Sequence, residues 1–115
     1  MVVERGEVWW ADLGEPNGAE PGYRRPVIIV QADAFNRSRI DTTIALILTS
    51  NLQLLDAPGN ALIRAKDSGL PKDSVANVSQ LATLDREMLT ERVGRVPKGA
   101  LRRIDDGLRL ALSLR

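Results

Sequence analysis

Most of the chain consists of short apolar stretches separated by polar segments rich in Gly, Pro, Asn and Asp. Such stretches, with β-branched or aromatic residues between turn-forming residues, are typical of β-strands. Pro26 opens one of them, at the first position of a strand, where proline is tolerated. The pattern predicts five or six strands, at residues 7–13, 27–30, 42–49, 60–65, 74–81 and 92–96.

The segments between these strands predict turns and short helical pieces. Residues 32–40 are polar and predict a turn of helix or an irregular connection. Gly69 and Pro71 predict a connection over residues 66–73, and Asp85 is expected to cap one short helical turn.

The hydrophobic pattern changes its period near the C-terminus, where apolar residues recur at helical spacing. The repeating positions are Leu101, Ile104, Leu108, Ala111 and Leu112, and Leu110 and Leu114 widen the apolar face. A face this wide suits a helix that is covered on two sides, by the sheet and by a second subunit. Short strands and one terminal helix predict a mainly β (α+β) fold, a small and strongly bent antiparallel barrel. At 115 residues, the chain is expected to form one domain over residues 1–115.

The composition excludes several kinds of chemistry. The chain has no cysteine and no histidine, which removes disulfides, thiolate nucleophiles, histidine bases and the usual zinc ligands. Asp105 and Asp106 point about 100° apart on a helix and make a poor chelate, so we expect no metal and no cofactor. A formal net charge of +1 means that any phosphate site must be local. No signal peptide and no membrane span are expected, which predicts a cytoplasmic protein.

Several motifs resemble those of a known family. They read RGEVWWADL at residues 5–13, GAEPGYRRPV at 18–27, and DSV at 73–75 followed by QLATLD at 80–85. Asn36-Arg37 and Leu48-Thr49-Ser50 also fall at family-like positions, as does the C-terminal helix. In this order the motifs cover nearly the whole chain, which resembles the MazF/PemK (Kid-like) toxins of type II toxin–antitoxin systems.

The resemblance implies an SH3-like antiparallel barrel with a C-terminal helix, the CcdB/MazF-type toxin fold, working as a homodimer. It implies a metal-independent, sequence-selective endoribonuclease that cuts single-stranded RNA and so inhibits translation and growth. The expected products carry 2′,3′-cyclic phosphate and 5′-hydroxyl ends. A MazE-like antitoxin is the expected protein partner, blocking the RNA groove. The cleavage sequence, the antitoxin itself and the class of RNA target are not implied.

Three residues match catalytic positions of the family. Arg25 offers a planar fork of donors to the charge that develops on a phosphoryl group, and Pro26 restricts the backbone of Arg25 to an extended conformation. Thr49 matches a catalytic Thr or Ser, whose hydroxyl donates to a non-bridging oxygen or relays a proton. Glu20 matches an acidic position and acts as a general base or pins the loop through an ion pair.

Further positions are expected to contact RNA through phosphates, stacking or base edges. They are Tyr23, Arg24, Pro26, Asn36, Arg37, Ser50 and Gln80. Trp9 and Trp10 are expected in the core and at the dimer interface. Some relatives carry an Arg-x-Asp pair before the Gln, where this chain has Asn77 and Ser79, so the resemblance does not assign the general base and acid.

Two alternatives to a nuclease remain open. The gyrase poison CcdB resembles this family in fold and would act on a protein target without cutting RNA. An RNA-binding barrel that has lost its activity is the other alternative, and the missing Arg-x-Asp pair is consistent with it. The Arg25-Pro26 motif and Thr49 favour the nuclease, because a protein-directed poison has no need of them.

Overall fold

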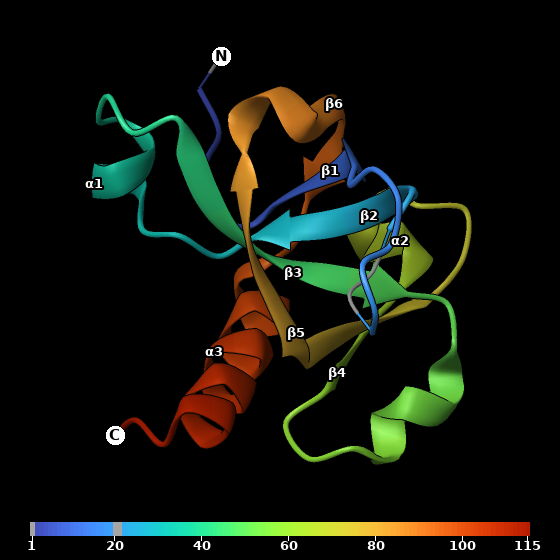
Figure 1. Cartoon of the computed structure of the whole chain (residues 1–115). Helices are drawn as coiled ribbons and strands as arrows, with labels where there is room; N and C mark the ends of the chain where they lie inside the picture. Colours follow the sequence, from blue (N-terminus) through green and yellow to red (C-terminus); the bar gives the residue numbers. More distant parts are fainter. Residues whose placement is uncertain (1, 20–21) are drawn as a thin grey trace.

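The computed structural model describes residues 2–19 and 22–115, which form a curled six-stranded antiparallel sheet and a C-terminal helix (Figure 1). The strand order is β4-β5-β3-β2-β1-β6, so β3 lies in the interior of the sheet. The predicted mainly β fold with a terminal helix is confirmed. The strands are β1 (Glu7–Asp12), β2 (Arg24–Ile29), β3 (Thr42–Thr49), β4 (Ala61–Ile63), β5 (Ser74–Asp85) and β6 (Leu89–Arg95).

The strands agree with the hydrophobic pattern except at their ends. β5 continues to Asp85, four residues beyond the predicted end, because Thr42 of β3 pairs with Asp85 and extends the ladder. Its second half alternates between exposed and less exposed positions, which weakens the apolar signal in the sequence. β6 begins at Leu89 rather than at residue 92, since Leu89 pairs with Ala11 of β1.

Short helical pieces join the strands. They are α1 (Asp33–Asn36), η1 (Leu52–Asp56), α2 (Ala65–Ser68) and η2 (Arg86–Met88). The turn of helix at α1 was expected, whereas α2 replaces part of a predicted connection and ends at Gly69 with φ of +85°, a left-handed cap that glycine favours. The expected helical turn after Asp85 is present as η2, but the Asp85 side chain does not form a capping hydrogen bond.

Core side chains lie on both faces of the sheet. One cluster contains Val8, Ile28, Leu46 and Leu48, and α3 (Lys98–Leu112) packs against it through Ala100, Ile104 and other apolar residues. The other cluster contains Trp9, Val27, Ala45 and Ile47 together with Leu84 and Leu89. Because neighbouring residues of a strand point to opposite faces, β3 contributes to both clusters and is buried along most of its length.

The C-terminal helix leaves apolar side chains uncovered. Leu110 and Leu112 of α3 are exposed, as is Leu114 beyond its end. Asp105 on the same helix forms an ion pair with Arg5. In the part of the chain that the structure describes, no helix is both long and apolar enough to cross a membrane.

A bulge in β5 changes the pairing with β3 partway along the strand. Leu46 pairs with Leu81 and Leu48 pairs with Ala76, so residues 77–80 of β5 lie opposite a single residue, Ile47. Extra residues on one strand of an antiparallel pair bend that strand and re-aim its side chains. β5 therefore turns a corner at these positions (Figure 1).

Glu7 is a buried carboxylate in β1 with three hydrogen-bond donors around it. It accepts from the Glu4 backbone N–H at 2.8 Å, from Trp9 Nε1 at 3.1 Å and from Arg92 Nε at 2.7 Å. Burial alone would raise the pKa of Glu7, but the hydrogen bonds from Glu4, Arg92 and Trp9 outweigh it. The pKa therefore lies below its ordinary value of 4.5.

This lowered pKa makes part of the folding stability depend on pH. The charged form stabilises the fold fully above pH 4.5, and this contribution is lost as the pH falls through the lower pKa of the folded state. We expect Glu7→Gln to lower the free energy of unfolding by about 1–3 kcal/mol at pH 7. In urea unfolding followed by tryptophan fluorescence, the difference between the two proteins should shrink at pH 3. A difference that does not change with pH would contradict the assignment.

Candidate functional site

The sheet places Arg25 and Thr49 side by side. Val27 of β2 and Ile47 of β3 are the last paired residues at this end of the two strands, and Arg25 and Thr49 lie two residues beyond them. Residues directly opposite each other in antiparallel strands direct their side chains to the same face of the sheet. Two residues that are 24 positions apart in the sequence thus meet at one end of neighbouring strands.

A pocket of about 280 Å³ lies at this end of the sheet, and we call it the Arg25 pocket. The start of β2 and the end of β3 form one wall of this pocket, and the segment before β5 forms another. Its lining residues are Trp10, Arg24, Arg25, Pro26, Leu48, Thr49, Ser50, Leu70, Pro71, Lys72 and Ser74.

Arg25 and Thr49 both offer hydrogen-bond donors in this pocket. The Arg25 side chain is exposed, and its Nε donates to the Gly22 carbonyl at 3.4 Å. Among residues 2–19 and 22–115, none accepts a hydrogen bond from the two terminal nitrogens of this guanidinium, which can therefore face an anion. Thr49 Oγ1 accepts from the Asn51 backbone N–H at 3.2 Å, which leaves the hydroxyl hydrogen to be donated. The pair can bind two oxygens of one phosphate.

Arg24 is held differently from its neighbour Arg25. Its guanidinium lies 4.2 Å from the centre of the Trp10 ring, a cation–π distance. It also forms a solvent-exposed ion pair of 3.9 Å with Glu91 of β6. Trp10 was expected in the core and at the dimer interface. Its partly buried side chain packs against the core, as expected, and also lines the Arg25 pocket beside Arg24.

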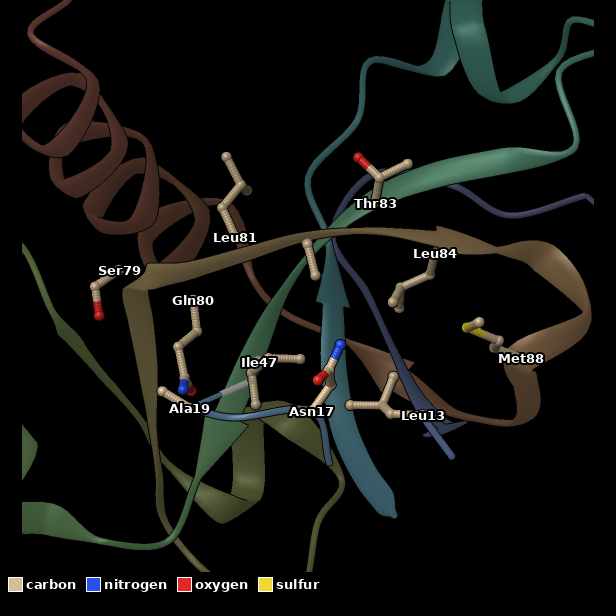
Figure 2. A pocket seen from close by; sticks show the side chains of 11 residues that line it. Leu13, Asn17, Ala19, Ile47, Ser79, Gln80, Leu81, Thr83, Leu84 and Met88 are labelled. Atoms are coloured by element: carbon tan, nitrogen blue, oxygen red, sulfur yellow. The ribbon is translucent and has the colours of Figure 1, made fainter. Parts of the chain in front are cut away.

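A larger hollow of about 860 Å³ lies over the sheet next to this pocket (Figure 2), and we call it the Gln80 groove. Its lining residues are Leu13, Asn17, Ala19, Ile47, Ser79, Gln80, Leu81, Ala82, Thr83, Leu84 and Met88. Ile47 and Thr49 lie two residues apart on one strand, about 7 Å. The groove and the pocket are thus close enough to contact consecutive nucleotides of one strand.

Residues 4–112 match the family model of the PemK-like, MazF-like toxins of type II toxin–antitoxin systems. The chain belongs to this family. It is 47% identical over 114 residues to the endoribonuclease MazF2 of Mycobacterium bovis, covering 99% of this chain and 100% of that relative. The endoribonuclease EndoA of Bacillus subtilis is 34% identical, covering 99% and 97% of the two chains. A solved mycobacterial endoribonuclease in complex with its cognate antitoxin is 26% identical, with a TM-score of 0.79 over 98% of this chain and 97% of that one.

Most of the residues that we predicted from the MazF/PemK motifs lie at these two hollows. Arg24, Arg25, Pro26, Thr49 and Ser50 line the Arg25 pocket, and Gln80 lines the neighbouring groove. Tyr23 lies just before β2 and is 65% exposed, so its ring is available to a ligand. Glu20, the third catalytic candidate, lies outside the described residues.

Asn36 and Arg37 do not lie with the others. Asn36 is completely buried, and its side chain donates to Gln31 O at 3.0 Å and accepts from Thr43 Oγ1 at 2.9 Å. The prediction that Asn36 contacts RNA does not fit this burial, and we assign it a structural role. Arg37 is exposed at the end of α1, near the start of β3, whereas Thr49 ends that strand.

Topology explains why Asn36 and Arg37 lie apart from the other predicted residues. The loop from β1 to β2 and the loop from β2 to β3 follow consecutive strands of an antiparallel sheet, so they emerge at opposite ends of β2. Tyr23 lies in the first of these loops, whereas Asn36 and Arg37 lie in the second. The strand order that separates them is visible only once the pairing is known.

Two polar residues of the Arg25 pocket were not predicted from the sequence. Lys72 and Ser74 flank Asp73, whose carboxylate accepts from the Ala65 backbone N–H at 2.8 Å and fixes this segment. Their position beside the family motif at residues 73–75 was the available signal. It did not show that the motif folds back against the ends of β2 and β3.

Proposed function

We propose that this chain is the toxin of a toxin–antitoxin pair and cuts single-stranded RNA at the Arg25 pocket. The observation that carries the proposal is that Arg25 and Thr49 line the same pocket, which offers a guanidinium and a hydroxyl donor to one phosphate. Relatives at 47% and 34% identity along nearly the whole chain are named endoribonucleases.

The reaction that fits this site is a transesterification within the RNA. The ribose 2′-oxygen forms a bond to the adjacent phosphorus, and the bond from phosphorus to the 5′-oxygen breaks. The proton of the 2′-hydroxyl passes to a base, and the leaving 5′-oxygen receives a proton. A 2′,3′-cyclic phosphate and a 5′-hydroxyl result. Glu20 is the candidate that the sequence offers for the base or for anchoring the loop.

Arg25 and Thr49 stabilise the charge that builds up in this reaction. Negative charge concentrates on the non-bridging oxygens as the fifth bond to phosphorus forms. The terminal nitrogens of Arg25 donate to these oxygens, and Thr49 Oγ1 donates its hydrogen to one of them. Because a guanidinium supplies the positive charge, the proposed mechanism requires no metal ion.

The wider assembly also follows from family membership. A mycobacterial relative was solved in complex with its cognate antitoxin. We propose that a MazE-like antitoxin with acidic residues covers Arg24, Arg25 and Lys72 and so competes with RNA in the cytoplasm. A homodimer would cover the exposed leucines at positions 110, 112 and 114.

The test is cleavage of a long single-stranded RNA by the purified chain in excess EDTA, with the product ends mapped. We expect discrete cuts with cyclic-phosphate ends at a rate that Mg²⁺ does not raise. Thr49→Val keeps the shape of the side chain and removes the hydroxyl, so it should slow cutting about 10–100-fold. Absence of cutting by the folded wild-type chain would favour a protein-directed poison or an inactive RNA-binding barrel.

A further inference from the structure

Three side-chain amides are linked in a chain that leads from the segment before β4 to the Gln80 groove. Asn60 Nδ2 donates to Asn77 Oδ1 at 3.4 Å, and Asn77 Nδ2 donates to Gln80 Oε1 at 3.3 Å. Asn60 lies just before β4, while Asn77 and Gln80 lie in the β5 bulge.

Backbone groups fix the orientation of the first two amides. The Val78 N–H donates to Asn60 Oδ1 at 2.9 Å, and the Ser79 N–H donates to Asn77 Oδ1 at 3.3 Å. Ser79 Oγ adds a second hydrogen bond to Asn77 Oδ1 at 2.8 Å. A backbone N–H can only donate, so both Asn residues must turn their oxygen toward it. If either amide rotated by 180°, its NH2 group would face a backbone N–H, and two donors cannot form a hydrogen bond.

The orientation of Asn77 then determines the orientation of Gln80. Oδ1 of Asn77 accepts hydrogen bonds from Ser79 and Asn60, so Asn77 turns its Nδ2 toward Gln80. Gln80 accepts this hydrogen bond through Oε1. The Nε2 end of Gln80, with two donors, is left for the groove. Figure 2 shows the Gln80 side chain pointing from β5 into the groove, towards Ala19 and Ile47.

We infer that Asn60 and Asn77 are positioning residues that make Gln80 a donor toward RNA, so that Gln80 selects a base edge presenting only hydrogen-bond acceptors. This inference rests on the proposed function and assigns chemistry to its specificity. A glutamine with both ends free reads adenine, through its amino group and N7 together. Gln80 has its oxygen engaged by Asn77, which favours the O6 and N7 edge of guanine or the O4 of uracil.

The test is a change in base preference, measured on a random-sequence single-stranded RNA library whose cut ends are mapped. Asn77→Asp keeps the shape of the side chain but offers Gln80 only acceptors. Gln80 should then donate Nε2 to position 77 and present Oε1 to the groove. At one position of the cleavage site, we expect preference to move about ten-fold from guanine or uracil toward adenine or cytosine, which carry an amino group.

Two further variants separate this effect from charge and from misfolding. Gln53→Glu adds the same charge on the exposed η1, outside both hollows, so it should leave base preference unchanged. Gln80→Glu changes a groove side chain to an acceptor and should lose the preference for guanine or uracil even if Asn77→Asp fails to fold.

The outcomes distinguish this inference from the proposed function. If the wild type cuts RNA, and Gln80→Glu and folded Asn77→Asp cut it with the same base preference as the wild type, the amide chain does not determine base specificity. If the wild type neither cuts nor binds the library, the proposed function and this inference are both overturned.

Discussion

Arg25→Ala should slow RNA cleavage about 10²–10³-fold, the cost of removing one pre-aimed donor from a developing oxyanion. The residue lies at the surface, so its loss removes no core contact and the fold should remain intact. Single-turnover cleavage of a labelled oligonucleotide measures the chemical step directly. Thermal unfolding of the same preparation checks that the variant is folded.

Two matched arginine variants sharpen this result. Arg25→Lys retains the positive charge but loses the planar fork, so it should recover only part of the rate. Arg37→Ala removes another exposed arginine, near the far end of β3, and should leave the cleavage rate within about two-fold of the wild-type rate. If Arg37→Ala slowed cleavage as much as Arg25→Ala, the reacting phosphate would not lie in the Arg25 pocket.

Gly107→Ala should be the most destabilising of the small substitutions in this chain. A Cβ at position 107 would lie 2.0 Å from the Gly59 carbonyl oxygen, much closer than atoms approach without displacement. The obstacle is backbone, so α3 must move away from the segment before β4. Overpacking of this kind costs about 3 kcal/mol. Urea unfolding should show the loss as a lower midpoint.

Gly99→Ala is the natural control for this prediction, because it lies on the same helix and a Cβ there meets no atom within 4 Å. Alanine is the better helix former, so this change should be neutral or stabilise the chain by up to about 1 kcal/mol. Similar destabilisation from both substitutions would mean that α3 does not pack against Gly59. The comparison removes helix propensity as the cause.

The elements that could be predicted from the sequence are those whose signal is local. β1 and β3 could be predicted because their β-branched and apolar residues lie between turn-forming residues. α3 could be predicted because its apolar residues recur at helical spacing. The second half of β5 is held by its pairing with β3 and has no comparable pattern of its own. The short helix α2 depends on Gly69 in the left-handed conformation, which the sequence also permits in a plain turn.

The candidate site shows the same division between local and long-range information. Motifs pointed to Arg25 and Thr49, and the register of β2 and β3 supplies the physical reason that they meet. The burial of Asn36 depends in part on Thr43 of β3, which the motif does not reveal. The contact of Trp10 with Arg24 likewise depends on the pairing of β1 with β2. The amide chain from Asn60 to Gln80 joins residues that no single-sequence pattern links.

The burial of β3 also bears on how the protein opens. Its amides lie between β5 and β2, with apolar side chains on both faces, so they can exchange with solvent only when the sheet itself comes apart. Thr49 ends this strand, while the loop before β2 is exposed around residues 15–19. The Thr49 hydroxyl is thus attached to a strand that opens only together with the sheet. Heat should therefore abolish activity only at the temperature where the β3 amides lose their protection from exchange.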